Sequence, residues 1–455
     1  MRIPQHPKNG DDELQMFETS ELTSVAGHAC ISYKGCLICW GGYGHAQGVA
    51  YYREPNFMYI YPYKLAQKSD VWFKFKVDKG DVPKKTSGAA AVVKNGKMYL
   101  FGGQSWDEEE DQNRAVWRSS LATSHLYSLD LNTGIWKFHK IPDEDKLPTP
   151  RDKSAAWATE NGLYFFAGYG PSWRRVNTSK YIFQVQDYFE DFDSYIFGNA
   201  WNNQLFRFTD KWERIEHGGC IPTPRAASGA TYVKHTDKTY VFGGRHHTER
   251  LNDLYELDMK SFIWTKIDLK PAPEGRSWMT FTYNPDRNCV YMYGGLSSHS
   301  EPMQDTWILN IDTAKKELKW EKMPNVALPP RLWHCSVFVD GALISYGGLC
   351  ASPPLQSEVG VVNTIQVTTF SPSSLMNLAM QKVSSNGRML SLTPKHLWPS
   401  LNLSTQIKRF LQRRKACNTM LFDDKILRSL PPMSLGFSTM LIPNMRLVFE
   451  FDLSI

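Results

Sequence analysis

The chain has 455 residues, of which 42% are hydrophobic and 22% are charged, as is typical of a soluble globular protein. Much of its net charge of +6 lies near the C-terminal end, in stretches such as IKRFLQRRK, so charge alone gives little support for nucleic-acid binding. No run of 18 or more apolar residues occurs and Met1 leads into polar sequence, so we expect neither a membrane span nor a secretory signal.

The eight cysteines show no spacing typical of a disulfide framework. The single CxxC pair, Cys36 and Cys39, lies in an apolar run that predicts a strand, and an odd separation on a strand points two side chains to opposite faces. We therefore interpret both as strand packing rather than as metal ligands or a redox pair. We expect no metal, no other cofactor, and a reducing compartment, the cytoplasm or the nucleus or both.

An apolar run that ends in Gly-Gly, or once in Ala-Gly, is the dominant pattern of the sequence. It occurs as LICWGGY (37–43), MYLFGGQ (98–104), LYFFAGY (163–169), TYVFGGR (239–245), VYMYGGL (290–296) and LISYGGL (343–349). A strand rich in small residues precedes these runs, and an aromatic strand and a tryptophan strand follow, as in HLYSLDLNTGIWKF. This four-stranded unit resembles the kelch repeat, which forms one blade of a β-propeller. Six copies predict an all-β fold, a six-bladed kelch propeller over residues 25–370.

The segments on either side of the repeats differ from them. Residues 1–24 are expected to form an N-terminal arm, and because the sixth repeat lacks a tryptophan strand, we expect this arm to complete the sixth sheet and close the ring. Residues 371–401 have neither Gly-Gly nor strand alternation and predict a small helical segment. Residues 402–455 form a tail whose structure the pattern does not indicate.

Side chains suited to binding gather on one face of the predicted propeller. In an antiparallel blade, the loop between the second and third strands opens on the same face as the connection to the next blade. These positions hold cations, hydroxyl groups and large rings: Tyr43, Lys153, Tyr169, Trp201, Arg245, Arg250, Ser277, Trp278 and Trp333.

Arg245 and Arg250 belong to one loop and have no counterparts in the other repeats. Two guanidinium groups without an evident acid–base pair suit the capture of an anion better than catalysis. A protein's C-terminal carboxylate is one such anion, although charge alone fits phosphate or an acidic side chain equally. The two histidines after Arg245 are adjacent in a loop, where side chains rarely converge on one metal ion.

Other conspicuous residues have structural explanations. Arg225, Arg276 and Arg331 each precede a blade, which indicates a task common to the repeats, such as capping blade ends. Trp136 and Trp264 lie in predicted fourth strands, where kelch tryptophans fill the space between blades.

Residues 371–401 predict two short helices. Leu375, Ala379 and Val383 are spaced to share one face of the first helix, and Pro394 opens the second, followed by Leu397. Packing against the propeller and docking of a partner both fit this pattern.

Two stretches after the repeats resemble ligase motifs. SLMNLAMQKV (374–383) resembles the elongin BC-binding box, and LTPKHL (392–397) resembles the cullin-2 box that follows it. With CWGGY, PTPRDK, FGGRxxxxRLNDLY, GRSW and PRLWH, they make the chain similar to the kelch-domain-containing substrate receptors of cullin-2 RING ubiquitin ligases that recognise C-terminal diglycine degrons.

This resemblance implies a function and a set of roles. In that family two arginines and a serine bind the terminal carboxylate, which here would be Arg245, Arg250 and Ser277, while tyrosines and tryptophans shape a slot that admits only glycine. Lys153 would reach the peptide backbone. The implied partners are elongin B, elongin C, cullin-2, a RING subunit and substrates ending in Gly-Gly, without nucleic acid, membrane or catalysis by this chain. The sequence departs from the family at Met279, where the motif has histidine.

Two further functions fit the propeller. The chain could be a kelch scaffold outside any ligase, which binds a folded protein through the same face, with purely structural C-terminal helices. It could also be a kelch-type enzyme, although no convergent set of metal ligands is visible in the sequence.

Overall fold

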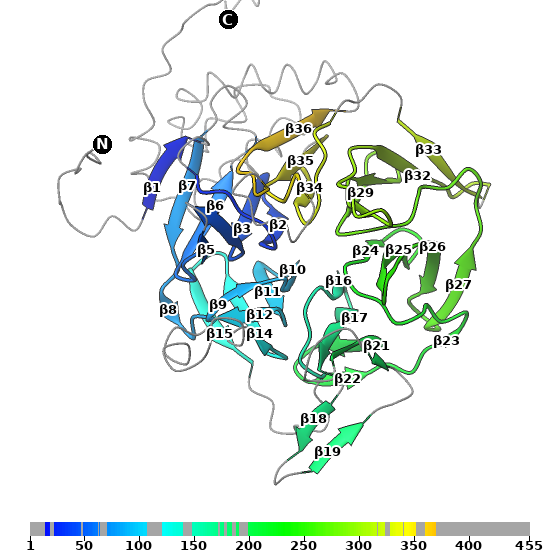
Figure 1. Cartoon of the computed structure of the whole chain (residues 1–455), viewed down its shortest axis with the longest axis horizontal. Coiled ribbons are helices and arrows are strands. Elements are labelled where there is room, and N and C mark those ends of the chain that lie inside the picture. The colour runs from blue at the N-terminus through cyan, green and yellow to red at the C-terminus, as the bar shows by residue number, and fades with distance from the viewer. Residues whose placement is uncertain are drawn as a thin grey trace, which may run out of the picture.

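Six mainly antiparallel β-sheets form a ring, and each sheet is one blade of a β-propeller (Figure 1). The predicted all-β, six-bladed fold is therefore confirmed. Within the described residues, no helix is long and apolar enough to cross a membrane. The computed structural model describes residues 14–18, 22–46, 49–61, 63, 71–106, 121–139, 148–171, 173–176, 180–183, 188–190, 199–315, 317–323, 328–339, 341–351 and 360–369. The predicted helical segment 371–401 and the tail 402–455 lie outside this part of the chain.

Within a blade, the strands follow one another from the centre of the ring outward (Figure 1). Blade 1 contains β2 (Ala29–Tyr33), β3 (Cys36–Trp40), β6 (Phe57–Tyr61) and β7 (Val71–Lys76), and blade 2 contains β10 (Ala90–Lys94), β11 (Lys97–Phe101), β14 (Leu126–Asp130) and β15 (Ile135–Phe138). Blade 3 contains β16 (Ala155–Thr159), β17 (Gly162–Pro171), β21 (Asn199–Phe208) and β22 (Trp212–Arg214), and blade 4 contains β24 (Gly229–Val233), β25 (Lys238–His246), β26 (Glu249–Asp258) and β27 (Ile263–Ile267). Blade 5 contains β29 (Thr280–Asn284), β30 (Cys289–Tyr293), β32 (Thr306–Asp312) and β33 (Glu317–Lys322), and blade 6 contains β34 (Cys335–Val339), β35 (Ala342–Tyr346) and β36 (Ile365–Thr369).

Short strands extend the blades and their loops. They are β1 (Leu14–Glu18), β4 (Tyr43–Ala46), β5 (Val49–Tyr52), β8 (Lys79–Gly80), β9 (Lys85–Ser87), β12 (Gln104–Trp106), β13 (Leu121–Ala122), β18 (Trp173–Val176), β19 (Lys180–Phe183), β20 (Tyr188–Glu190), β23 (Gly218–Gly219), β28 (Arg276–Ser277) and β31 (Leu296–Ser297).

A closed ring of backbone hydrogen bonds joins the six blades. One residue, two positions before the first strand of each blade, has a left-handed backbone, with φ between 53° and 69°. Its N–H donates to the carbonyl of the equivalent residue in the preceding blade, at 2.8–3.3 Å, and the first blade bonds in the same way to the last. The six residues are Gly27, Gly88, Lys153, Ala227, Trp278 and Trp333.

The glycine pairs lie where each blade touches the next one. A Cβ atom on Gly102 would stand 2.3 Å from the carbonyl oxygen of Arg151, and the N–H of Gly103 donates to that same oxygen at 2.9 Å. The pair in blade 5 is placed in the same way against Arg331. This crowding explains why an apolar strand must end in residues with little or no side chain.

Aromatic rings fill the space between neighbouring blades. The tryptophan of a fourth strand packs against the aromatic residue before the glycine pair of the preceding blade, as Trp136 does against Trp40 with ring centroids 5.4 Å apart. Trp264 packs in the same way against Phe166 at 5.0 Å. Both tryptophans are 1% exposed, so their predicted structural role is confirmed.

The recurring arginines before the blades bind inside their own blade. Arg225 donates to the carbonyl of Gly243 and to both carboxylate oxygens of Asp253, at 2.7–3.0 Å. Arg331 bonds instead to the carbonyl of Gly347 and to Thr364. These contacts confirm that the recurring arginines share a structural task.

The described strand of the N-terminal arm lies on blade 1 rather than on blade 6, where the arm was expected to pair. Among the described residues, β1 pairs with β7 and extends blade 1. The chain just before β2 reaches the last blade, because Val25 donates to the carbonyl of Val362 and accepts from the N–H of Gly348. These bonds and the inner ring of hydrogen bonds join the two ends of the propeller.

The two cysteines of the CxxC pair occupy opposite faces of β3, as predicted. Cys36 packs with the residues between blades 1 and 2, whereas Cys39 packs with those between blades 1 and 6.

Replacement of Arg276 by alanine is expected to destabilise the fold strongly. Its buried guanidinium donates to both oxygens of Asp305, at 2.6 and 3.0 Å, so the variant leaves a half-buried carboxylate without its partner. The cost should be roughly 3 kcal/mol, measured by urea denaturation. Lys234→Ala, which breaks a pair exposed on both sides, serves as the control and should leave the denaturation midpoint unchanged.

The contribution of this ion pair should also depend on pH. Although burial opposes ionisation, the hydrogen bonds and charge of Arg276 hold the pKa of Asp305 below its ordinary value. The stabilisation is therefore present above pH ~4 and disappears as the pH falls through the lower, folded-state pKa. A midpoint difference between Arg276→Ala and the parent that does not shrink in acid would contradict this assignment.

Candidate functional site

The hairpin of β25 and β26 carries the two arginines that have no counterpart in the other blades. Arg245 and Arg250 lie directly opposite each other across this hairpin. Like charges at opposed positions of an antiparallel pair destabilise it by ~0.2–1 kcal/mol. The hairpin therefore places two positive charges together at a cost, unless an anion lies between them.

Each of the two guanidinium groups lies over a tryptophan ring. The Cζ atom of Arg245 is 5.6 Å from the centroid of Trp201, and that of Arg250 is 5.6 Å from the centroid of Trp278. The Nε of Arg245 donates to the carbonyl of His247 at 2.7 Å, whereas the buried Nε of Arg250 has no hydrogen-bond partner. Neither guanidinium is paired with a carboxylate among the residues that the structure describes. Burial and the nearby Arg245 lower the pKa of Arg250 to about 10.

The strand β28 brings a hydroxyl and an indole next to these arginines. β28 contacts both β25 and β26. The hydroxyl of Ser277, which is 0% exposed, and the indole N–H of Trp278 are both buried without a hydrogen-bond partner. Buried polar groups are rarely left unpaired, so two such donors beside an arginine pair indicate a place for an acceptor.

The indoles of Trp278 and Trp333 cover the centre of this face. Their rings are stacked, with centroids 5.5 Å apart and planes inclined by 23°. Tyr43 meets the ring of Trp333 edge-on at 5.3 Å. Gly27 lies so close to Trp333 that a Cβ atom there would stand 2.9 Å from the indole. Gly27, before blade 1, thus makes room for the indole of Trp333, before blade 6.

Lys153 belongs to the same central group but is already engaged. Its ammonium nitrogen lies 5.3 Å from the ring centroid of Trp333 and forms an ion pair with the buried carboxylate of Asp152. Burial raises the pKa of Asp152 against the opposing influence of Lys153. The charge of Lys153 is therefore largely compensated, unlike the charges on the hairpin.

Tyr169 and Trp201 form the opposite flank of the cluster. Their ring centroids are 5.0 Å apart, and Trp201 also contacts the rings of His246 and His247, at 6.1 and 6.0 Å. In the sequence, these histidines stand out only as candidate metal ligands. Their contact with Trp201 gives them a different position, as part of the aromatic wall beside Arg245.

Direct contacts connect eight of the nine predicted substrate-binding residues in one group, and the ninth, Ser277, precedes Trp278 in the chain. Contacts run from Tyr169 through Trp201 to Arg245, across the hairpin to Arg250, and then through Trp278 to Trp333, with Tyr43 and Lys153 around it. Whether they bind a ligand stays a prediction. The five predicted partner-binding residues lie outside the described part of the chain: Leu375, Ala379, Val383, Pro394 and Leu397.

Comparison with known proteins places the repeats in a defined family. The model of the KLHDC2/KLHL20/DRC7 Kelch-repeats domain matches residues 27–201 and 193–373. The chain belongs to this kelch-repeat family. Kelch domain-containing protein 1 of Mus musculus is 30% identical over 398 residues, which cover 85% of this chain and 90% of the relative. Kelch domain-containing protein 2 of Bos taurus is 29% identical over 422 residues, which cover 86% and 95%.

Within this kelch propeller, Arg250 should be dispensable for stability. The variant Arg250→Gln removes a like-charge repulsion and a cation–π contact of similar size, so the free energy of unfolding of the ligand-free protein should change by less than ~1 kcal/mol. The matched control is Arg276→Gln, because the guanidinium of Arg276 is hydrogen-bonded within its own blade. This variant should lower the free energy of unfolding several times more. Equal losses in urea denaturation would mean that Arg250 is a structural residue.

Proposed function

We propose that this kelch protein is the substrate-recognition subunit of an elongin BC–cullin-2 RING ubiquitin ligase, and that it binds proteins ending in Gly-Gly. The observation that carries the proposal is the arginine pair of the β25–β26 hairpin, which has no carboxylate partner among the described residues and lies beside the unpaired hydroxyl of Ser277. In this proposal the chain itself performs no catalysis.

The chemistry of the site favours a carboxylate as its ligand. A carboxylate has two oxygens and accepts parallel hydrogen bonds from guanidinium groups, each worth roughly 1.5–3 kcal/mol when charge-assisted. Its negative charge would also relieve the repulsion between Arg245 and Arg250. Ser277 could donate to the same group, and the indole N–H of Trp278 could donate to the adjoining peptide carbonyl.

The proposed preference for glycine follows from the rings around this point. A chain end that reaches the arginines passes the stacked indoles of Trp278 and Trp333 and the flank formed by Tyr169 and Trp201. Flat rings leave space for a bare backbone, whereas a Cβ atom would collide with them. Selectivity would then come from steric exclusion of larger residues rather than from an additional attraction to glycine.

The ligase part of the proposal rests on the sequence after the propeller and on the family. SLMNLAMQKV and LTPKHL follow the last repeat in the order of an elongin BC box and a cullin-2 box. Leu375, Ala379 and Val383 would enter elongin C, while Pro394 and Leu397 would contact cullin-2. A kelch scaffold outside any ligase is the alternative, and it requires no such contacts.

The direct test is a calorimetric titration of the full chain with a peptide ending in Gly-Gly. Binding should be lost when the same peptide is amidated at its C-terminus or extended by one residue, because both changes remove the free carboxylate from the terminal glycine. Equal affinity for the free and amidated peptides would exclude carboxylate capture.

The arginine variants test which residues hold that carboxylate. Arg245→Ala and Arg250→Ala should each weaken peptide binding by about 2 kcal/mol or more, roughly 30-fold, because a buried charge pair loses one partner. Lys260→Ala is the control, since Lys260 is exposed in the turn between β26 and β27 of the same blade. If both arginine variants bind like the parent, another part of the molecule holds the carboxylate.

Co-purification with elongins B and C separates the ligase receptor from the scaffold. Leu375→Asp should abolish recovery of both elongins while leaving peptide affinity unchanged, because a charge cannot enter an apolar groove. Failure of the parent chain to bind elongins would favour the scaffold.

A further inference from the structure

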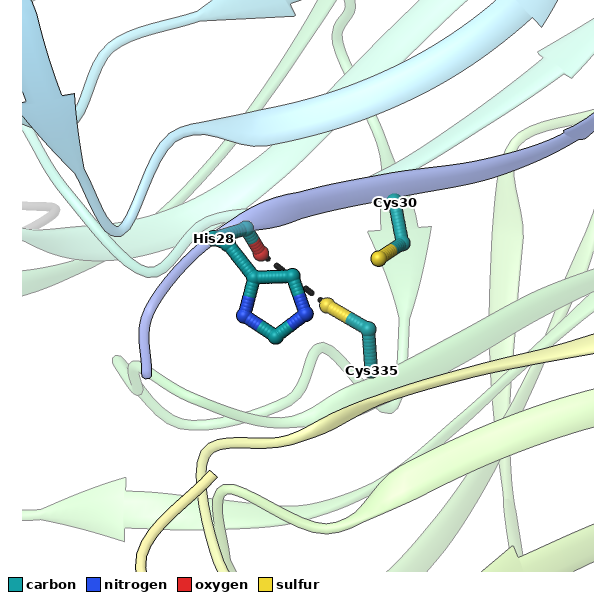
Figure 2. Close-up of side chains that lie close together, drawn as sticks. All are labelled: His28, Cys30 and Cys335. Atoms are coloured by element: carbon teal, nitrogen blue, oxygen red, sulfur yellow. Dashed lines mark hydrogen bonds between the residues drawn. The ribbon is translucent and has the colours of Figure 1, made fainter. Parts of the chain in front are cut away.

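A histidine and three cysteines meet at the junction between the first and last blades, away from the arginine hairpin. The ligand atoms of His28, Cys30 and Cys335 all lie within 4.8 Å of one another (Figure 2). The sulfur of Cys39 lies 2.9 Å from that of Cys30. In the proposed function this cluster has no part.

The strand geometry brings these residues together. His28 and Cys30 are two positions apart, at the entrance to β2 and within it, so their side chains point to the same face. Cys39 lies directly opposite Cys30 in the pairing of β2 with β3. Cys335 begins β34, which contacts β2 across the blade junction, and its thiol donates to the carbonyl of His28 at 3.0 Å. Figure 2 shows the three labelled side chains grouped between these two strands.

The imidazole of His28 has the thiols of Cys335 and Cys39 as polar neighbours, but it makes no hydrogen bond of ordinary geometry among the described residues. The residue is 4% exposed, and both ring nitrogens are buried and unpaired. The adjoining glycine turns lie close to His28. A Cβ atom on Gly42 would stand 2.7 Å from the Cβ of His28, and one on Gly347 would stand 2.8 Å from its ring. The equivalent histidine of blade 6, His334, has its Nε2 3.3 Å from the hydroxyl of Thr280. An unpaired buried imidazole next to thiols needs another explanation.

We propose that His28, Cys30, Cys39 and Cys335 form a structural zinc site. One imidazole and three thiolates are a ligand set that Zn²⁺ binds tetrahedrally, with Zn–S distances of roughly 2.3 Å. Tetrahedral sulfurs are then roughly 3.8 Å apart, so Cys30 and Cys39 separate slightly on binding. Cys30 and Cys335 are partly exposed, which gives an ion a way in. The ligands were not apparent in the sequence, because Cys335 lies about three hundred positions from the others.

The site would connect the two ends of the propeller. His28, Cys30 and Cys39 belong to blade 1 and Cys335 to blade 6, so one ion would bridge the junction where the ring closes. Zinc would therefore add metal–ligand bonds to the backbone contacts between Val25 and the last blade. Loss of the ion should lower the stability of the whole ring rather than affect ligand binding alone.

Metal analysis of the full chain, purified without chelators and then supplied with Zn²⁺ and dialysed, tests this proposal. One zinc ion per chain is expected by mass spectrometry of the elements. Replacement of the ion by Co²⁺ should produce the visible absorption typical of tetrahedral thiolate coordination, a measurement that needs no variant. Removal of the ion by a strong chelator should lower the melting temperature, and Zn²⁺ should restore it.

Variants then identify the ligands. Cys335→Ser and Cys39→Ser should each lower zinc content at least ~10-fold after dialysis. Cys289→Ser is the matched control, because this buried cysteine lies in blade 5 and should leave the zinc content unchanged.

Three results would overturn the proposal. One is a chain that retains no zinc even when the ion is supplied in excess. A second is full zinc content in the cysteine variants. The third is a peptide mass map, measured after alkylation and digestion, that shows Cys30 bonded to Cys39. Their sulfurs are 2.9 Å apart, so a small movement would bring them to the disulfide length of about 2.05 Å. The arginine hairpin is not involved in any of these outcomes.

Discussion

The closed circle of six backbone hydrogen bonds is the constraint on which the rest of this propeller depends. Each bond requires a left-handed residue before the first strand of a blade, and the bond between Gly27 and Trp333 joins the two ends. The glycine pairs and the inter-blade tryptophans then fill the wedge between neighbouring sheets. The candidate binding face inherits its shape from this circle, since Lys153, Trp278 and Trp333 are themselves members of it.

The repeats are alike in structure but unequal in chemistry. The recurring arginines, such as Arg225, are buried, and their donors are satisfied by acceptors of their own blade. Arg250 differs because it is half-buried, its Nε has no partner, and its pKa is lowered to about 10. A guanidinium that the fold does not use, placed opposite another one, is available for a ligand. The distinction between the structural arginines and the candidate binding arginines therefore lies in their partners rather than in their burial alone.

Much of the fold was predictable because it recurs. The five Gly-Gly pairs and the one Ala-Gly pair identified the blades, and Trp136 and Trp264 identified fourth strands, because these residues recur at similar positions in the repeats. Features that occur once were harder to predict. The pairing of β1 with β7 carries no signal in the sequence, and the compensation of Lys153 by the adjacent Asp152 depends on burial. The contacts around Arg245 and Arg250 could be anticipated from loop positions, whereas the meeting of His28 with Cys335 required the closed ring.

A crystal structure of the full chain with a bound peptide ending in Gly-Gly tests the central claim most directly. The account predicts that the oxygens of the terminal carboxylate lie ~3 Å from the guanidinium groups of Arg245 and Arg250 and accept from Ser277, with the last two glycines between the tryptophan rings. A peptide whose carboxylate points into solvent, or which binds elsewhere on the propeller, would contradict it.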